Sequence, residues 1–231
     1  MEDKPDYQKI AQQAQENQES LIESGQLSMC PKCERPYPPK WGSCPDCKTV
    51  KQVNYAEDAS DIDIPTKYVK AYEGAFTDSE SSLIEDFSAG KIEGVFLHGN
   101  QGTGKTYLAT ALLHEYVARL DANGCWMTVG SMLAAIRGTY SQNVGISESQ
   151  VMEKYIKIPA LLLDDLGAEK TTEWTVSTMR EIIAGRIDWC RPTIVTSNLS
   201  LAEIDKWNPR VASRLGGLEV IEMTGTDRRL A

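Results

Sequence analysis

The chain has 231 residues, 41% of them hydrophobic and 25% charged, which is long enough for one ordinary globular domain with an appendage. Its formal net charge of −9 excludes a broadly basic surface, so we expect any contact with nucleic acid to use a local patch or a strip assembled across several copies. No stretch approaches the ~20 apolar residues of a membrane span, and the polar start is unlike a secretion signal, so we expect a cytoplasmic protein.

The first fifty residues predict a helical segment followed by a metal-binding module. Residues 6–24 are rich in Gln, Glu and Ala and carry a thin apolar stripe, which fits either a solvated segment or a helix that docks on a partner. Two C-x-x-C pairs follow, separated by ten residues: Cys30 with Cys33, and Cys44 with Cys47. Four thiolates in this arrangement match the tetrahedral ligand set of a structural Zn²⁺.

The competing interpretation of a C-x-x-C pair is a thioredoxin-like redox motif, but two pairs this close, without a surrounding βαβ pattern, disfavour it. We therefore predict a compact zinc module within residues 1–50. Residues 51–63 are acidic and are predicted to form a linker. The two remaining cysteines, Cys125 and Cys190, stand in apolar surroundings and are expected in the core.

From residue 64 onward, helical patterns alternate with short apolar runs. These runs cover residues 95–98, 125–129, 160–164, 193–196 and 219–223. Strands that alternate with helices are typical of an α/β fold. We therefore predict a domain over residues 64–231 with a five-stranded parallel sheet flanked by helices.

The most specific motif is a complete phosphate-binding loop (P-loop) of the form G-x-x-x-x-G-K-[ST]. It reads Gly99-Asn100-Gln101-Gly102-Thr103-Gly104-Lys105-Thr106. An apolar run precedes it and a helix-like stretch from Tyr107 follows, which is the strand, loop and helix context that such a loop requires. The glycines free backbone N–H groups to cradle phosphates at a helix N-terminus. Lys105 is expected on the β- and γ-phosphates and Thr106 on Mg²⁺, so the sequence predicts an ATP site that includes Tyr107.

A second motif is an apolar run, residues 161–163, that ends in two carboxylates. Asp164 is expected to hold Mg²⁺ across from Thr106. Asp165 stands where many ATPases of this kind have a Glu that orients the attacking water. Its shorter arm favours slow hydrolysis or help from another residue, for which Glu169 is a candidate.

Two further motifs complete the ATPase pattern. The apolar run at 193–196 leads to Asn198, a polar residue at a strand end that is expected to sense the γ-phosphate. Arg210 and Arg214 stand four residues apart on one face of a predicted helix. They are either a surface pair engaged in salt bridges or an arginine finger, which stabilises the phosphoryl transition state in a neighbouring copy's site.

With these motifs in order, residues 64–231 resemble the AAA+ ATPase domain of bacterial helicase loaders of the DnaC/DnaI type, whose core the IstB-type transposition helpers share. The other matching phrases are Ile64-Pro-Thr-Lys-Tyr68, Met132-Leu133, Arg210-Val-Ala-Ser-Arg214-Leu215 and Met223-Thr-Gly-Thr-Asp-Arg228. The resemblance implies an ATPase that self-associates with ATP, assembles on a ring-shaped DnaB-type replicative helicase and helps place it on single-stranded DNA. The zinc module resembles the DnaI arrangement, in which such a domain binds the helicase, and the chain end fits loaders without a full helical lid.

The same resemblance assigns roles to particular residues. It makes Arg214 the finger, with Arg210 in support, and Arg228 a candidate sensor-2 residue. It places Ile64 and Tyr68 near the adenine.

Other functions stay open. An IstB-like helper that remodels a transposase on duplex DNA shares the core motifs, although the zinc module disfavours it. A hydrolysis-poor, ATP-gated adaptor protein fits Asp165 and the acidic charge balance. A small-molecule P-loop kinase needs acceptor-binding residues and a lid, for which the sequence carries no signal.

We expect the purified protein to carry one Zn²⁺ per chain, because a module this small has too little core to fold without its metal. Measurement of the metal content tests this directly. A metal-free sample whose N-terminal residues are folded as before would contradict the prediction.

Overall fold

The computed structural model describes residues 24, 28–29, 36–37, 64–120, 122–139 and 147–227. The chain divides into two compact units, Met1–Val50 and Lys51–Ala231. In the first unit, strands β1 (Ser28–Met29) and β2 (Pro36–Tyr37) pair antiparallel. The four cysteines predicted to bind zinc lie outside the described residues, so the zinc module stays a prediction.

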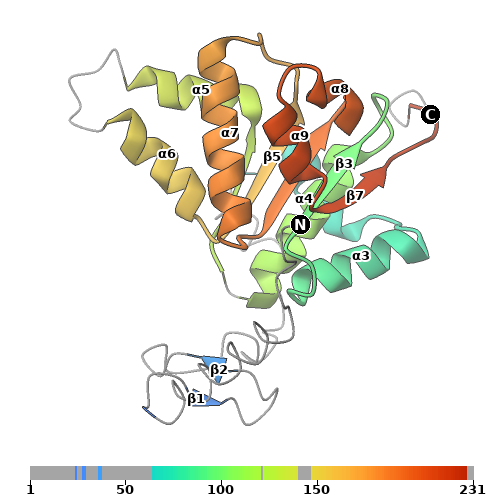
Figure 1. The fold of residues 1–231 in the computed structure, drawn as a ribbon. Helices are drawn as coiled ribbons and strands as arrows, with labels where there is room; N and C mark the ends of the chain where they lie inside the picture. The colour runs from blue at the N-terminus through green and yellow to red at the C-terminus, as the bar shows by residue number, and fades with distance from the viewer. Residues whose placement is uncertain are drawn as a thin grey trace, which may run out of the picture. The chain divides into compact units, whose positions relative to one another are not determined.

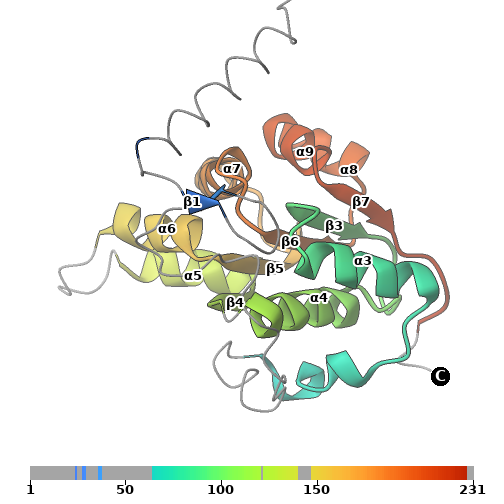
Figure 2. The ribbon, with the colours of Figure 1, turned by 90° about the horizontal axis from the view of Figure 1, so that it is seen from below.

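The second unit is built on a five-stranded sheet (Figure 1) with the strand order β4-β5-β6-β3-β7 (Figure 2). The strands are β3 (Gly94–His98), β4 (Gly124–Thr128), β5 (Ala160–Leu166), β6 (Thr193–Ser197) and β7 (Glu219–Glu222). All four neighbouring pairs are parallel, and each strand coincides with one of the apolar runs. The predicted α/β fold with a five-stranded parallel sheet is therefore confirmed.

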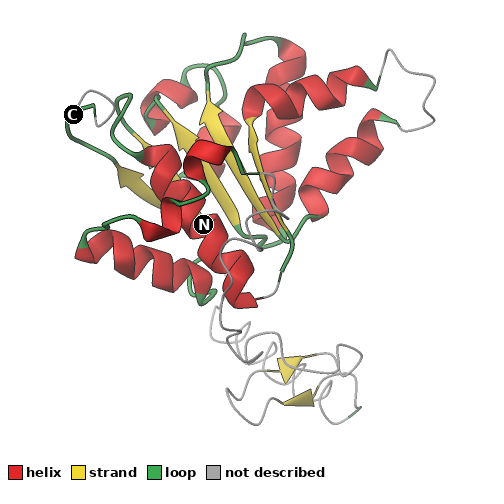
Figure 3. Cartoon of the chain, turned by 180° about the vertical axis from the view of Figure 1, so that it is seen from behind, coloured by secondary structure: helices red, strands yellow, loops and turns green. Residues whose placement is uncertain are grey.

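Helices cover both faces of this sheet, as Figures 2 and 3 show. They are α3 (Asp78–Ser88), α4 (Lys105–Leu120), α5 (Val129–Gly138), α6 (Glu148–Lys157), α7 (Glu173–Asp188), α8 (Leu201–Asp205) and α9 (Pro209–Leu215), with short 3₁₀ turns η3 (Thr66–Tyr68) and η4 (Ala71–Glu73) before α3. Side chains alternate along the strands, so Val95 and Leu97 belong to the apolar core that includes residues of α3 and α4, while Phe96 belongs to the core that includes residues of α5, α6, α7 and α9. None of these helices is long and apolar enough to span a membrane.

Local sequence sets where several helices begin. Thr77, Ser147 and Ser200 each accept a hydrogen bond from the backbone three residues on, and the Glu or Gln there bonds back to the cap residue's N–H. These reciprocal capping boxes satisfy N–H groups that have no partner within the helix. The apolar faces of the helices then decide which side of the sheet they cover.

A fully buried guanidinium joins one helix to the sheet. Arg186 of α7 donates through Nε to the Thr193 hydroxyl at 2.9 Å and through its two terminal nitrogens to five backbone carbonyls. These carbonyls belong to Tyr155, Ile156, Ile158, Pro159 and Pro192. Burial lowers the pKa of Arg186 to about 9, so the group stays charged at neutral pH. Its charge therefore lies at the C-terminal end of α6, where a cation is favoured.

The two scattered cysteines differ from each other. Cys125 of β4 is partly buried and packs against the core, but Cys190 is exposed, so the prediction that it lies in the core is wrong. Cys190 follows α7 in a turn with a left-handed φ of 49°, and this turn carries its side chain to the surface.

Candidate nucleotide-binding site

The P-loop joins the end of β3 to the start of α4. Gly99 and Gly102 have φ values of 137° and 77°, in the region that favours glycine. A Cβ at Gly99 would overlap the Met223 carbonyl, and a Cβ at Gly102 would overlap the Asp227 carboxylate. These two positions therefore need glycine for two reasons: the backbone conformation and the close approach of the segment after β7.

The loop holds its lysine at its centre. The Lys105 ammonium donates to the Gly99 and Asn100 carbonyls at 2.8 and 2.6 Å, and only 8% of the residue is exposed. The buried Thr103 hydroxyl also donates to the Asn100 carbonyl, at 3.0 Å. Asn100 and Thr103 thus shape the loop, and two of its carbonyls hold the Lys105 ammonium inside it.

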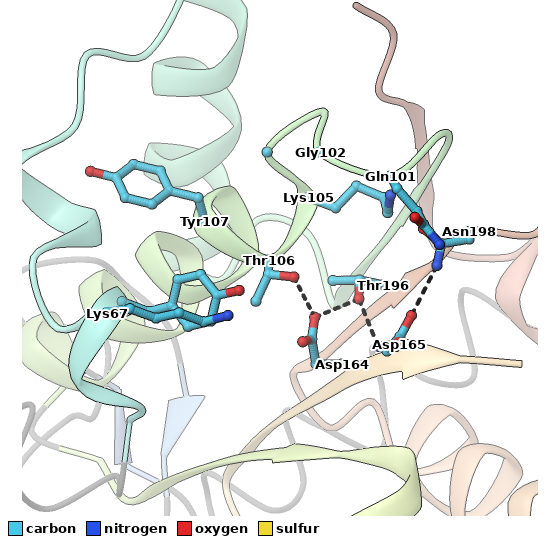
Figure 4. Close-up of a pocket in the computed structure, with 12 residues that line it drawn as sticks. Lys67, Gln101, Gly102, Lys105, Thr106, Tyr107, Asp164, Asp165, Thr196 and Asn198 are labelled. Carbon is cyan, nitrogen blue, oxygen red and sulfur yellow. Dashed lines mark hydrogen bonds between the residues drawn. The ribbon is translucent and has the colours of Figure 1, made fainter. Parts of the chain in front are cut away.

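Asp164, at the carboxyl end of β5, meets the P-loop helix. Its Oδ1 accepts from the Thr106 hydroxyl at 2.9 Å and from the Thr196 hydroxyl of β6 at 2.7 Å (Figure 4). Burial raises the pKa of Asp164, and the two hydroxyl hydrogen bonds act in the opposite direction. A carboxylate beside a hydroxyl is an oxygen donor set suited to Mg²⁺, so the residues predicted for this ion lie together.

The second carboxylate has a different environment. Asp165 is exposed and accepts at Oδ1 from the Asn198 amide at 3.1 Å. Figure 4 shows both side chains at the same cavity as Asp164. Glu169, the candidate helper, instead accepts from the Gly167 N–H at 3.2 and 3.3 Å. Burial raises the pKa of Glu169.

These residues surround a cavity of about 540 Å³, enough for a nucleotide-sized ligand. Its wall consists of Lys67, Tyr68, Gln101, Gly102, Gly104, Lys105, Thr106, Tyr107, Asp164, Asp165, Thr196 and Asn198. Most of the predicted P-loop, acidic-motif and sensor residues are thus brought together in one place. Ile64 lies in the core with Leu108 and Leu112 rather than on this wall.

Aromatic side chains form one end of the cavity. The Tyr68 ring packs against Trp126 with ring centroids 6.1 Å apart, and the Tyr107 ring packs against Phe76 at 5.9 Å. The Tyr107 hydroxyl donates to the Lys70 carbonyl at 3.2 Å, which ties the η3–η4 segment to the start of α4. The Tyr68 and Tyr107 side chains offer flat surfaces on which a base can stack.

The two arginines proposed as finger residues are not part of the cavity wall. Arg214 pairs with Asp188 at the end of α7, and Arg210 is exposed. Asp188 ends the helix that leads into β6, and Arg214 lies near the end of the helix that leads into β7. The cavity instead lies at the carboxyl ends of β3, β5 and β6. Arg214 is therefore at the opposite edge of the sheet from the cavity of its own chain. Arg228 lies outside the described residues.

Two residues of the cavity wall were not predicted from the sequence. Lys67 stands next to Tyr68, and its charge in the segment expected near the base is the sequence signal for it. Its ammonium lies 4.4 Å from the Tyr68 ring centroid. Thr196 was treated only as part of a strand, yet its hydroxyl contacts Asp164.

The parallel sheet, the P-loop and the paired hydroxyl and carboxylate define a P-loop nucleotide-binding protein of the AAA+ type. Residues 67–212 match the family of IstB-like ATP binding proteins, which is more than half of the chain, and the chain belongs to this family.

Curated relatives include two kinds of protein. The chain is 28% identical over 123 residues to the replicative helicase loader DnaC of Escherichia coli strain K12, covering 53% of this chain and 49% of the relative. It is 29% identical over 116 residues to the replicative helicase loader DnaI of Bacillus subtilis, covering 50% and 36%. It is 34% identical over 106 residues to an insertion-sequence ATP-binding protein of Mycobacterium tuberculosis, covering 46% and 41%. The chain thus spans about half the length, or less, of these relatives.

Solved structures share the fold. A crystal structure of DnaI superposes with a TM-score of 0.61 at 26% identity, covering 75% of this chain and all of that one. The DnaC helicase loader superposes with a TM-score of 0.60 at 19% identity, covering 69% of this chain and all of that one. At 19% identity, the similarity to the DnaC structure shows the fold alone.

We expect Lys67→Met to weaken binding of ATP on the order of five-fold, because it removes a positive charge from the wall of a site for an anion. Calorimetry with ATP and with adenosine measures this, and adenosine binding should not change. The control is Lys70→Met, because the Lys70 ammonium instead lies 3.7 Å from Glu73. Equal ATP affinity of Lys67→Met and the parent would refute a role for Lys67.

Proposed function

We propose that the protein is an ATP-dependent loader that places a DnaB-type replicative helicase on single-stranded DNA. The observation that carries the proposal is the cavity in which the P-loop, Asp164 and Asn198 meet, in a chain whose relatives include helicase loaders of both the DnaC and DnaI kinds. The predicted zinc module adds support, because it resembles the helicase-binding domain of the DnaI arrangement.

The residues divide the work of ATP hydrolysis. The P-loop amides and Lys105 bind the phosphates, and Thr106 with Asp164 would hold Mg²⁺, since both offer oxygen donors on the cavity wall. When bound, Mg²⁺ neutralises charge that develops on the phosphate oxygens. Asp165 orients the attacking water, and Asn198 holds the Asp165 carboxylate toward the cavity.

The position of Arg214 supports self-association as part of the proposal. Because this side chain lies at the far edge of the sheet from its own cavity, only a second copy can receive it as a finger. The ion pair with Asp188 has to open for this contact to form. ATP held between two copies then couples nucleotide state to the geometry of the assembly.

An IstB-like transposition helper is the second candidate. The family match and the relative from a mycobacterial insertion sequence favour it. A hydrolysis-poor adaptor is a third, favoured by the short arm of Asp165. If Asp165→Ala leaves loading of the helicase intact, nucleotide binding rather than turnover carries the function.

The central experiment mixes the full-length protein with the replicative helicase, or with an insertion-sequence transposase, and weighs the complexes with and without ATP. We expect an ATP-dependent complex with the helicase. Lys105→Ala should abolish it by removing the phosphate-binding ammonium, whereas Lys154→Ala, an exposed lysine on α6, should not. A complex with the transposase alone would contradict the loader function and support the transposition helper.

We expect Arg214→Ala to retain ATP binding by a single copy but to lose turnover that rises with protein concentration, by about 10³-fold, because the finger acts in trans. Hydrolysis assays over a range of protein concentrations measure this. Arg180→Ala, an exposed arginine of α7, is the control. Equal turnover of Arg214→Ala and the parent at high concentration would remove Arg214 from this role.

A further inference from the structure

The pairing of β5 with β6 is interrupted next to the cavity. Leu163 lies opposite Val195, but the next paired residues are Leu166 and Ser197. Two residues of β5, Asp164 and Asp165, therefore stand against the single residue Thr196 of β6. This arrangement is a β-bulge, which bends a strand and changes the direction of its side chains.

The bulge explains how two consecutive carboxylates reach one cavity. Successive side chains of a regular strand point to opposite faces of the sheet. Asp165 instead has a left-handed φ of 64°, and both Asp164 and Asp165 line the cavity. Aspartate is among the few residues other than glycine that tolerate this conformation, but it remains strained and needs contacts that hold it.

Thr196 contacts both aspartates through one hydroxyl. The Asp165 N–H donates to Thr196 Oγ1 at 2.9 Å, and the Thr196 hydroxyl lies 2.7 Å from Asp164 Oδ1. Because a hydroxyl has a single proton and the backbone N–H uses one of its lone pairs, that proton is directed to Asp164. Thr196 is 1% exposed, so both bonds lie in a largely buried environment.

We propose that Thr196 is a positioning residue that holds the bulge and thereby presents both carboxylates to the same bound triphosphate. The proposal rests on the proposed ATPase function, since it assigns Thr196 to that site. Asn198, two residues further on, holds the Asp165 side chain, so Asp165 is fixed at its backbone by Thr196 and at its carboxylate by Asn198. Residues at the end of β6 and just after it thus hold both aspartates of β5 in place.

The test compares Thr196→Val, which keeps the shape but removes the hydroxyl, with Thr196→Ser, which keeps the hydroxyl. We expect Thr196→Val to lower kcat for ATP at least ten-fold while affinity for ATP in the presence of EDTA changes less than two-fold. Thr196→Ser should stay within three-fold of the parent. Thr196→Val with kcat within two-fold of the parent, or Thr196→Ser as impaired as Thr196→Val, would overturn the proposal.

Thr193→Val is the matched control. Thr193 is a fully buried threonine on the same strand, but its hydroxyl bonds to Arg186 and to the Arg191 carbonyl at the opposite end. We expect Thr193→Val to lower the Tm and leave kcat unchanged. Loss of kcat in Thr193→Val equal to that in Thr196→Val would make the effect a general loss of packing and overturn the positioning role.

A second readout does not depend on catalysis. In the parent without nucleotide, we expect slow hydrogen exchange of the Asp165 amide by NMR, because it is bonded to Thr196. Exchange should remain slow in Thr196→Ser and rise at least ten-fold in Thr196→Val. Fast exchange in the parent would overturn the proposal, whether or not Thr196→Val folds. A parent that neither binds nor hydrolyses ATP, but protects this amide, would instead count against the proposed function alone.

Discussion

One carboxylate oxygen joins the three segments on which the site depends. Oδ1 of Asp164 accepts hydrogen bonds from the hydroxyls of Thr106, at the start of α4, and Thr196, at the end of β6. These contacts span the P-loop, the acidic strand and the sensor strand, which are separated by 58 and 32 residues along the chain. The parallel sheet makes the meeting possible, because parallel strands bring their carboxyl ends to one edge, where ligands of open α/β sheets bind.

The same topology separates the ion pair of Arg214 and Asp188 from the nucleotide-binding cavity. A helix that leads into a parallel strand ends at the opposite edge of the sheet, so Arg214 and Asp188 meet there. In the proposed function, Arg214 and the nucleotide cavity are the two halves of one ATPase centre, and a single chain holds them on opposite edges of its sheet. The proposed centre is then complete only where two copies meet.

Much of the fold and site was predictable because the signals were local. Each apolar run became a strand, and the spacing of the P-loop specified its glycines and its lysine. Thr196 was missed because a β-bulge arises from the pairing of two strands and leaves no trace in the periodicity of either one. Ile64, which the family resemblance places near the adenine, lies in the core beside the cavity wall, so its expected role stays a prediction. Cys190 was misplaced because a turn overrides its apolar neighbours.

The buried guanidinium of Arg186 has a mechanical consequence. It binds carbonyls at the last turn of α6 and at the residues that precede β5 and β6. Arg186 thus ties the C-terminal end of α6 to α7 and to the start of the sheet. At the first turn of α6, the Trp174 indole N–H of α7 donates to Glu148 Oε1 at 2.8 Å, so α7 holds α6 at both ends and we expect the two helices to move as one unit.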